Sequence, residues 1–478
     1  MTWETVIGLE THVELATKTK IFCDCTTEFG GDPNTHCCPV CTGMPGTLPV
    51  LNEKVLEFAV KAGLALNGDI TRYCKFDRKN YFYPDLPKAY QISQLYLPIV
   101  RDGKVPIRLQ GGEEKVIRIH ELHMEEDAGK LVHDPWLDQT KADYNRCGVP
   151  LIEIVTEPDF RNGEEVIAYL EKLKSTLQYL GVSDCKMQEG SMRCDVNISV
   201  RPAGTEELGT RSEMKNINSF KAITRAIVFE TKRQIELIEE GKRVVQETRR
   251  WDENKDATFA MRSKENAQDY RYFPEPDIPP MEISEEYLAH VQSEMPEMAE
   301  DKMARYQKDF GLPEYDARMI TGQKALADFF EETLTLGTDA KQASNWIMGE
   351  VMGALGEHGL EAKDMKLTPK TLARLIELVR SGKLNRNTAV KVFNAVFADD
   401  GDVDVYVKEH GLEQVNDPAA LTAAVDKAFA ANPQSIADFK AGKEKAFGFL
   451  VGQVMRELRG KADPKAVNEA VREKLEQA

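Results

Sequence analysis

Several features are missing from this sequence, and each absence removes a class of function. No apolar run approaches the ~20 residues that a membrane helix needs, so we expect no membrane-spanning segment. The first residues lack the basic stretch and apolar run of a secretory signal peptide, which predicts a cytoplasmic protein. The Gly-x-x-x-x-Gly-Lys-Ser/Thr phosphate loop, the Gly-x-Gly-x-x-Gly dinucleotide loop and the Gly-x-Ser-x-Gly nucleophile elbow are also absent. Any bound nucleotide is then expected to be held by metal-binding carboxylates and basic side chains.

Positive charge is scarce over the chain as a whole, because the net charge of its 478 residues is −17. This acidic balance argues against non-specific binding of nucleic acid by the whole surface. The C-terminal segment 440–478 differs, with nine Lys or Arg against six Asp or Glu, a local net charge of +3. This segment is a candidate for binding nucleic acid, although its charge fits a solvated pair of helices equally well.

Five of the nine cysteines are concentrated in one short segment. Cys23-x-Cys25 is followed, after twelve residues, by Cys38-x-x-Cys41. Four thiolates suit tetrahedral Zn²⁺, and a pair spaced by two residues can turn both sulfur atoms toward one metal ion. Cys37 is left out because Cys38-x-x-Cys41 has the usual knuckle spacing. The pattern predicts a structural zinc site, with a redox pair or unmetallated thiols as the alternatives.

The chain is predicted to have an α+β fold followed by helices. Residues 1–293 combine period-two strands with amphipathic helices, such as 163–180 and 219–240, which is typical of an open antiparallel sheet backed by helices. The apolar period then becomes 3.6 from about Ser284. This change predicts a helical domain over 294–407 and a helical tail over 408–478.

Three local signals refine this division. The proline-rich segment 272–280 is interpreted as the end of the first domain's core and the approach to a linker. Asn387 is expected to cap one helix of the helical domain, and Asp417-Pro418 to begin a helix of the tail.

Acidic residues occur on strands where apolar residues are expected. Glu10 and His12 are two residues apart and so face the same side of a strand, while Glu125 lies in a similar strand. Glu153 lies in a run hydrophobic enough to be buried on both faces, where a carboxylate is costly unless it is paired or binds a metal. Together these four residues would suit Mg²⁺. The alternative is that each is satisfied separately by Arg, Lys or the backbone.

Basic and aromatic residues are concentrated in segment 75–88, which includes Lys79, Tyr81 and Lys88. Such a segment can bind a phosphate or a polar substrate, or it can be an exposed loop with its aromatic rings packed inward. Further candidates for holding phosphates are Arg193, Arg201, Lys215 and Arg250.

Several long strings closely resemble the B-subunit family of the Glu/Asp-tRNA amidotransferases, and the resemblance covers essentially the full chain. The strings are 8–15 (GLETHVEL), 38–46 (CPVCTGMPG), 79–88 (KNYFYPDLPK), 122–130 (LHMEEDAGK), 143–146 (DYNR), 152–159 (IEIVTEPD), 190–195 (GSMRCD) and 269–277 (DYRYFPEPD). Departures are small: Cys37 replaces a residue that is often hydrophobic, and Thr11 stands where Val is common.

The resemblance implies a cradle-shaped catalytic domain like the core of glutamine synthetase and creatine kinase, then a helical domain and a tRNA-binding tail. It implies a carbon–nitrogen ligase with glutamine as nitrogen donor, which converts Glu-tRNA(Gln) or Asp-tRNA(Asn) to Gln-tRNA(Gln) or Asn-tRNA(Asn). Mg-ATP would phosphorylate the side-chain carboxylate, and ammonia from a partner amidase would then displace the phosphate. The implied partners are the amidase A-subunit, the small C-subunit and tRNA, with the non-discriminating aminoacyl-tRNA synthetase as a further candidate.

The resemblance also implies roles for the candidate residues. Glu125 and Glu153, with Lys79 and Lys88, are expected to be catalytic, and Arg193, Arg201, Lys215 and Tyr81 to bind ATP. Mg²⁺ is expected at Glu10, His12, Glu125 and Glu153, and structural Zn²⁺ at Cys23, Cys25, Cys38 and Cys41. Two other functions remain open: a non-catalytic, zinc-containing adapter that binds tRNA, and a stand-alone ATP-dependent amide ligase.

Overall fold

The computed structural model describes residues 2–134, 136–263, 270–412, 418–440, 442–458, 462 and 464–477. The chain divides into two compact units, Met1–Met298 and Ala299–Ala478. Each unit has a buried apolar core, and the second unit has two separate ones. Asp269 and Asp417, which were part of the sequence-based expectations, lie outside the described residues.

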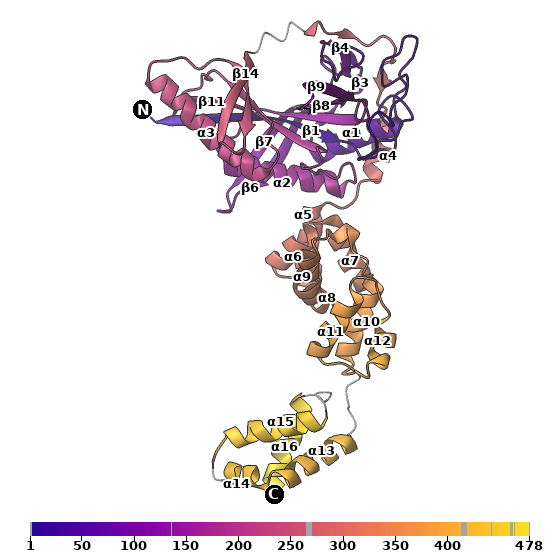
Figure 1. Ribbon diagram of the computed structural model, residues 1–478, viewed down its shortest axis with the longest axis vertical. Coiled ribbons are helices and arrows are strands. Elements are labelled where there is room, and N and C mark those ends of the chain that lie inside the picture. The colour runs from indigo at the N-terminus through magenta and orange to yellow at the C-terminus, as the bar shows by residue number, and fades with distance from the viewer. Residues whose placement is uncertain are drawn as a thin grey trace. The chain divides into compact units, whose positions relative to one another are not determined.

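The first unit is built on a nine-stranded sheet with the order β14-β13-β12-β11-β1-β10-β7-β6-β2 (Figure 1). Its strands, in chain order, are β1 (Trp3–Glu14), β2 (Asp69–Ile70), β6 (Val100–Arg108), β7 (Glu114–Glu126), β10 (Pro150–Thr156), β11 (Met192–Pro202), β12 (Ser212–Lys215), β13 (Glu247–Asp252) and β14 (Ala257–Ser263). Smaller sheets are formed by β3 (Tyr73–Cys74) with β16 (Met281–Glu282), by β4 (Asp77–Asn80) with β5 (Tyr90–Ser93) and β15 (Phe273–Pro274), and by β8 (Lys130–Asp134) with β9 (Gln139–Asp143).

The central strands have one apolar and one polar face, as their period-two patterns predicted. Alternate residues of β1 and β11 are buried, while His12 and Asn197 lie on the opposite, polar face. The expectation of a purely antiparallel sheet is wrong at one position, because β12 and β13 are parallel. Helix α3 (Phe220–Glu239) lies between these two strands in the sequence, and a helical crossover is the connection that parallel neighbours require.

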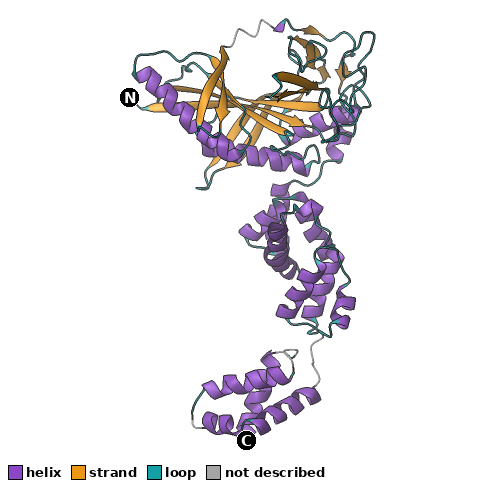
Figure 2. Cartoon of the chain, in the orientation of Figure 1, coloured by secondary structure: helices purple, strands orange, loops and turns teal. Residues whose placement is uncertain are grey.

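Helices α2 (Gly163–Tyr179) and α3 cover the apolar side of the sheet, and α1 (Glu53–Ala65) packs against β6 and β7 (Figure 2). The side chains of Asn162 and Ser219 cap α2 and α3 by accepting hydrogen bonds from backbone amides three residues later. Because the helices cover the apolar face, the polar face of β1, β7, β10 and β11 is left for a functional site.

The proline-rich segment does not leave the first unit, so its interpretation as the approach to a linker is wrong. Phe273–Pro274 forms β15 on β4, and Met281–Glu282 forms β16 on β3. The side chain of Glu275 is fully buried against Arg78, and Ile278 belongs to the first core. Prolines are compatible with this arrangement because β15 and β16 are two-residue edge strands. Helix α4 (Glu285–Ser293) then packs on α1.

The described part of the second unit is helical, as its 3.6-residue period predicted. One core is formed by α5 (Ala299–Phe310), α6 (Glu314–Thr321), α7 (Lys324–Thr335), α8 (Ala340–Trp346), a π-helical turn (Ile347–Val351), α9 (Met352–His358), a 3₁₀ turn (Ala362–Asp364), α10 (Pro369–Arg380), α11 (Arg386–Val396) and α12 (Val403–Glu409). The other is formed by α13 (Pro418–Ala431), α14 (Pro433–Lys440), α15 (Lys445–Glu457) and α16 (Pro464–Gln477).

One predicted helix cap is displaced by two residues. Asn385, and not Asn387, is the cap of α11, because its extended backbone lets its side chain accept a hydrogen bond from Thr388 N.

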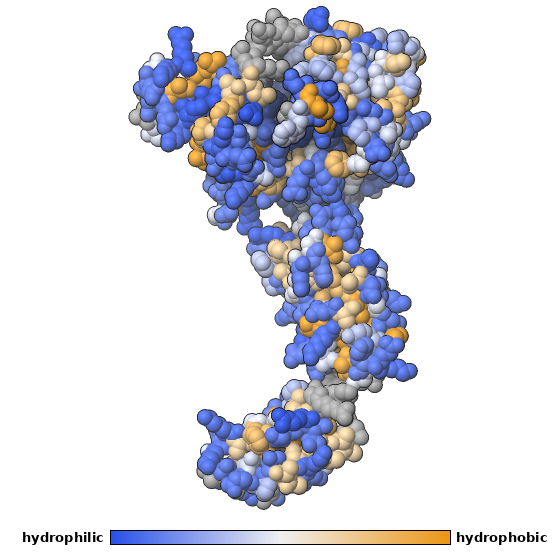
Figure 3. Space-filling model, viewed as in Figure 1, coloured by the Kyte–Doolittle hydropathy of each residue, from blue (hydrophilic) through white to orange (hydrophobic). Residues whose placement is uncertain are grey.

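Figure 3 shows that most of the visible surface is hydrophilic. Among the described helices, none combines the length and apolar character needed to cross a membrane.

Candidate functional site

A row of polar side chains crosses four neighbouring strands on the open face of the sheet. In the strand register, His12 on β1 lies opposite Glu153 on β10 and Arg193 on β11. Glu153 in turn lies opposite His123 on β7. Directly opposed residues of adjacent antiparallel strands have Cβ atoms about 4.5–5.5 Å apart, so these side chains are neighbours on one face of the sheet.

Two carboxylates and two imidazoles meet in this row. His12 Nε2 lies 3.5 Å from Glu125 Oε1 and 3.3 Å from Glu153 Oε2. His123 Nε2 lies 3.0 Å from the same Glu153 oxygen. Burial alone would lower the pKa of His12, but the charges of Glu153 and Glu125 outweigh it and raise that pKa to about 9. Burial also opposes the charge of His123, but Glu153, Glu121 and Glu125 raise its pKa. Both shifts favour protonated imidazoles beside the buried carboxylates.

Glu10 belongs to a second acidic cluster and not to the row with His12. Carboxylate oxygens of Glu10, Asp195 and Glu213 lie within 4.8 Å of one another. Lys215 forms ion pairs with Asp195 and Glu213. Burial opposes the charge of Lys215, but the two carboxylates raise its pKa. Asn197 Nδ2 donates a hydrogen bond to Glu10 Oε1 at 2.8 Å. The predicted four-residue metal set is thus divided between two clusters on one face of the sheet.

Lys79 on β4 reaches the first cluster from the small sheet. Its ammonium lies over the ring of Tyr270, 4.9 Å from the ring centroid, and 5.9 Å from the ring centroid of Tyr81. Burial would lower the pKa of Lys79, but Tyr272 and Glu125 are among the groups that raise it. Burial also raises the pKa of Tyr81 to about 12. The structure therefore brings Lys79 and Tyr81 close to the carboxylates.

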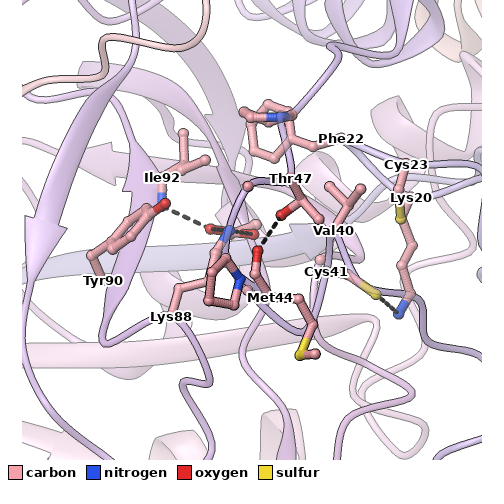
Figure 4. Close-up of a pocket in the computed structure, with 16 residues that line it drawn as sticks. Lys20, Phe22, Cys23, Val40, Cys41, Met44, Thr47, Lys88, Tyr90 and Ile92 are labelled. Atoms are coloured by element: carbon pink, nitrogen blue, oxygen red, sulfur yellow. Dashed lines mark hydrogen bonds and ion pairs between the residues drawn. The ribbon is translucent and has the colours of Figure 1, made fainter.

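Lys88 lines a cavity of about 210 Å³ whose lining includes no residue of the two carboxylate clusters (Figure 4). Its ammonium forms two hydrogen bonds with Glu126, at 2.5 and 2.6 Å. Lys20, Cys23 and Cys41 also line this cavity, so Lys88 is next to the cysteine cluster.

The arginine candidates lie in different places. Arg193 Nη1 donates to Asp127 Oδ2 at 2.9 Å, beside the histidine row. Arg201, eight residues further along β11, lies opposite Glu4 and forms an ion pair with it at 2.6 Å. Arg250 lies opposite Lys215 in the register of β13 and β12. The structure brings Arg193 and Lys215 to the two clusters but does not bring Arg201 there.

The four predicted zinc ligands converge. The sulfur atoms of Cys23, Cys25, Cys38 and Cys41 lie within 4.8 Å of one another. Cys41 Sγ accepts a hydrogen bond from Cys38 N at 3.2 Å. A hydrogen bond from Cys23 lowers the pKa of Cys41 to about 4, despite the opposing effect of burial. Cys37 Sγ instead donates to Asn34 O at 3.3 Å. Four converging thiols are a suitable donor set for tetrahedral zinc.

Sequence reasoning did not assign several residues of these clusters. Asp195 shares the polar face of β11 with Arg193, so its period-two spacing could have identified it. Glu213 lies in a four-residue strand, which is too short for a clear period. Tyr272 begins the proline-rich segment that we interpreted as the approach to a linker, and Tyr270 lies two residues before it. No local signal indicated their approach to Lys79.

Comparisons with known proteins identify the family of this chain. Residues 5–289 match the family described as the GatB/GatE catalytic domain, and residues 328–475 match the GatB domain. The chain is 63% identical over 476 residues to the aspartyl/glutamyl-tRNA(Asn/Gln) amidotransferase B-subunit of Lachnoclostridium phytofermentans, covering 100% of this chain and 99% of that protein. It is 60% identical to the protein of the same name from Lachnospira eligens (99% of each chain) and 57% identical to that from Caldicellulosiruptor saccharolyticus (100% of each chain). The chain therefore belongs to the B-subunit family of the aspartyl/glutamyl-tRNA(Asn/Gln) amidotransferases.

Proposed function

We propose that this chain performs the ATP-dependent half of tRNA-dependent amidation. The family is one of enzyme subunits, because an amidotransferase of this kind is a carbon–nitrogen ligase that takes nitrogen from glutamine. On this proposal the chain phosphorylates the side-chain carboxylate of Glu-tRNA(Gln) or Asp-tRNA(Asn). Ammonia from a partner amidase then displaces phosphate and leaves the amide.

The observation that carries the proposal is the pair of acidic clusters on one open sheet face. His12 Nε2 and oxygens of Glu125 and Glu153 lie within 4.8 Å of one another, as do oxygens of Glu10, Asp195 and Glu213. Paired clusters of metal ligands beside basic side chains can bind the metal ions and stabilise the charge that phosphoryl transfer requires when no phosphate-binding loop is present.

Both clusters fit a hard divalent cation such as Mg²⁺. Beside Glu10, the buried Asn197 Oδ1 has no hydrogen-bond partner among the described residues, so one more oxygen is available to a cation. In the first cluster, a cation would compete with the protons that the raised pKa values of His12 and His123 favour. Mg²⁺ bound there would neutralise phosphate charge and orient the transferred group.

The side chains of this chain then have separate tasks. A carboxylate is a poor acyl donor, so its oxygen must first take the terminal phosphoryl group and become a leaving group. Lys79, Arg193 and Lys215 are cations at the edges of the clusters, where they can stabilise the charge that spreads over the phosphoryl oxygens. Attack by ammonia on the acyl carbon forms the amide and releases inorganic phosphate.

The remaining predictions belong to the same proposal. The first domain (1–293) would be a cradle like the cores of glutamine synthetase and creatine kinase, with a structural zinc ion at the four cysteines and Tyr81 and Lys88 at the ATP or ammonia route. A helical domain (294–407) and a tRNA-binding tail (408–478) would follow. The partners would be the amidase A-subunit, the small C-subunit, tRNA(Gln) or tRNA(Asn) and the synthetase that charges them.

The test is to compare two variants in the reconstituted complex. Glu125→Gln preserves shape but removes a negative charge from the first cluster, so tRNA-dependent ATP hydrolysis should fall by about 10²–10³-fold. Glutamine hydrolysis by the partner should persist. Glu114→Gln is the matched control, because Glu114 is an exposed residue at the beginning of the same strand. If Glu125→Gln hydrolyses ATP like the control, the non-catalytic tRNA-binding adapter becomes the better explanation.

The tail is tested by truncation. Val403, Val407 and Leu412 pack in the core of α5–α12, so the deletion is best placed after Leu412. The truncated complex should bind its protein partners but bind tRNA more weakly, because the locally basic segment has been removed from an acidic chain. If the truncated and the full-length complexes bind tRNA with equal affinity at each of two salt concentrations, the tail has a structural role only.

A further inference from the structure

A lysine is fully buried beside the cysteine cluster. Lys20 is 0% exposed, and its ammonium lies 3.6 Å from Cys41 Sγ (Figure 4). The ammonium also donates to His36 O at 2.7 Å and to Tyr144 O at 3.5 Å. An ammonium has three N–H groups, so these three acceptors complete its hydrogen bonding.

Hydrogen bonding does not supply Lys20 with a counter-charge. In the described part of the chain, no Asp or Glu forms an ion pair with its ammonium, and Glu126 in the same cavity is paired with Lys88. Burying an unpaired ammonium costs several kcal/mol, so the fold would not be expected to retain one without a negative partner nearby. The sulfur atom of Cys41 is the one acceptor of Lys20 that can carry a full charge.

The proposed zinc site has the complementary problem. Four thiolates around one divalent zinc ion leave a net charge of about −2. Of the four cysteines, Cys41 is the buried one, and the other three are half-buried. A cation next to one sulfur atom would reduce this excess negative charge, and its effect would be largest where water is excluded. The positive charge of Lys20 and the negative charge of the zinc site therefore offset each other.

We propose that Lys20 is the built-in counter-ion of the tetracysteine zinc site and so determines how tightly the metal ion is held. This proposal rests on the zinc site of the proposed function and adds a positioning residue that does not touch the metal ion. Residues that contact metal ligands in this way typically change metal affinity about 10- to 100-fold when they are replaced.

The test measures zinc retention by the full-length chain in its complex. Lys20→Gln keeps a hydrogen-bond donor but removes the charge, and Lys20→Arg keeps the charge. Lys18→Gln is the control, since Lys18 is exposed and only two residues away. In competition with a chelator of known affinity, Lys20→Gln should bind zinc about 10- to 100-fold more weakly. Lys20→Arg should stay closer to wild type, and Lys18→Gln should equal it.

A second readout separates charge compensation from simple packing. Thermal unfolding is measured with and without zinc, and Lys20→Met serves as a second neutral variant. The neutral variants should lower the Tm of the zinc-loaded protein but affect the zinc-free protein less, because only the loaded site has an excess negative charge. The proposed role of Lys20 would be overturned if the neutral variants bound zinc as tightly as wild type, or if they destabilised the zinc-loaded and zinc-free proteins equally. If the purified wild-type protein contained no zinc and bound none, the zinc site itself would be overturned.

Discussion

Glu275 is predicted to hold the proline-rich segment on the strand that carries Lys79. Its fully buried carboxylate accepts hydrogen bonds from Arg78 Nε and Nη2, at 2.7 and 2.9 Å. Arg78 also binds Asp277 at 2.9 Å, but that side chain is 35% exposed. Since Arg78 precedes Lys79 on β4, and Tyr272 precedes β15, loss of this contact should disturb both side chains near the carboxylate clusters.

The magnitude follows from what Glu275→Gln removes and what it leaves. Hydrogen bonds to charged groups contribute about 1.5–3 kcal/mol each, and an amide oxygen can replace only part of the bidentate contact. Removing the partner of a buried charge costs about 3–5 kcal/mol. The cost of Glu275→Gln should stay below this range, because Arg78 still forms its ion pair with Asp277. Its guanidinium also still lies over the Tyr90 ring, 4.3 Å from the ring centroid. We therefore expect the segment to lose about 2–3 kcal/mol of local stability.

Hydrogen exchange measures this local stability directly. Two backbone hydrogen bonds report on the segment, from Glu275 N to Phe76 O and from Ile283 N to Arg72 O. A loss of about 2–3 kcal/mol should speed their exchange about 30- to 150-fold, at about 1.4 kcal/mol for each factor of ten. Asp277→Asn is the matched control, with an expected cost of about 0–1 kcal/mol because that ion pair is partly exposed. If both variants exchange alike, the buried pair does not hold the segment.

Three further predictions concern the proposed zinc site and the helical unit. Elemental analysis of the wild-type chain should find about one zinc ion; Cys38→Ser should lose this ion, whereas Cys37→Ser should keep it. Gly148→Ala should lower stability by about 1–2 kcal/mol and weaken zinc binding, because φ at Gly148 is +82° and the added methyl would lie 3.3 Å from Cys41 Cβ; unchanged Tm and zinc content would contradict this. Burial alone would raise the pKa of Glu331, but hydrogen bonds from Lys302 and its neighbours lower it. Urea unfolding should show that Glu331→Gln is less stable by about 1–3 kcal/mol at pH 7. This difference in stability should disappear as the pH falls through the lowered pKa of Glu331, because the wild-type carboxyl group then becomes neutral, like the amide of the variant.

The faces of the central strands could be predicted from sequence, but their register could not. Period-two spacing correctly placed Glu10 and His12 on one polar face. Residues two apart on a strand are about 7 Å apart along it, so both need not reach one ion. Pairing decides the outcome: Glu10 lies opposite Asp195, while His12 lies opposite Glu153. These partners come from β11 and β10, more than a hundred residues away in the sequence, and no local pattern specifies them.

Contacts across long sequence separations also explain the corrected fold predictions. Prolines in 272–280 correctly indicated an extended chain, but its position depends on Glu275 meeting Arg78, 197 residues earlier. The parallel pair of β12 and β13 depends on α3 crossing the sheet between them. By contrast, the convergence of the four cysteines depends on short spacings within one segment, and it could be anticipated.

The cysteine cluster and the carboxylate clusters are joined through the beginning of β10. Cys147 Sγ donates to Cys41 O at 3.4 Å, and Ile21 N donates to Gly148 O at 3.0 Å. Gly148 N then donates to Asp127 O at 2.9 Å, immediately after the end of β7. β10 and β7 carry Glu153 and Glu125, so the loop that holds the four sulfur atoms also fixes where these two strands begin and end relative to each other. A structural metal ion in that loop would therefore support the proposed phosphoryl transfer through backbone position alone, without contact with the substrate.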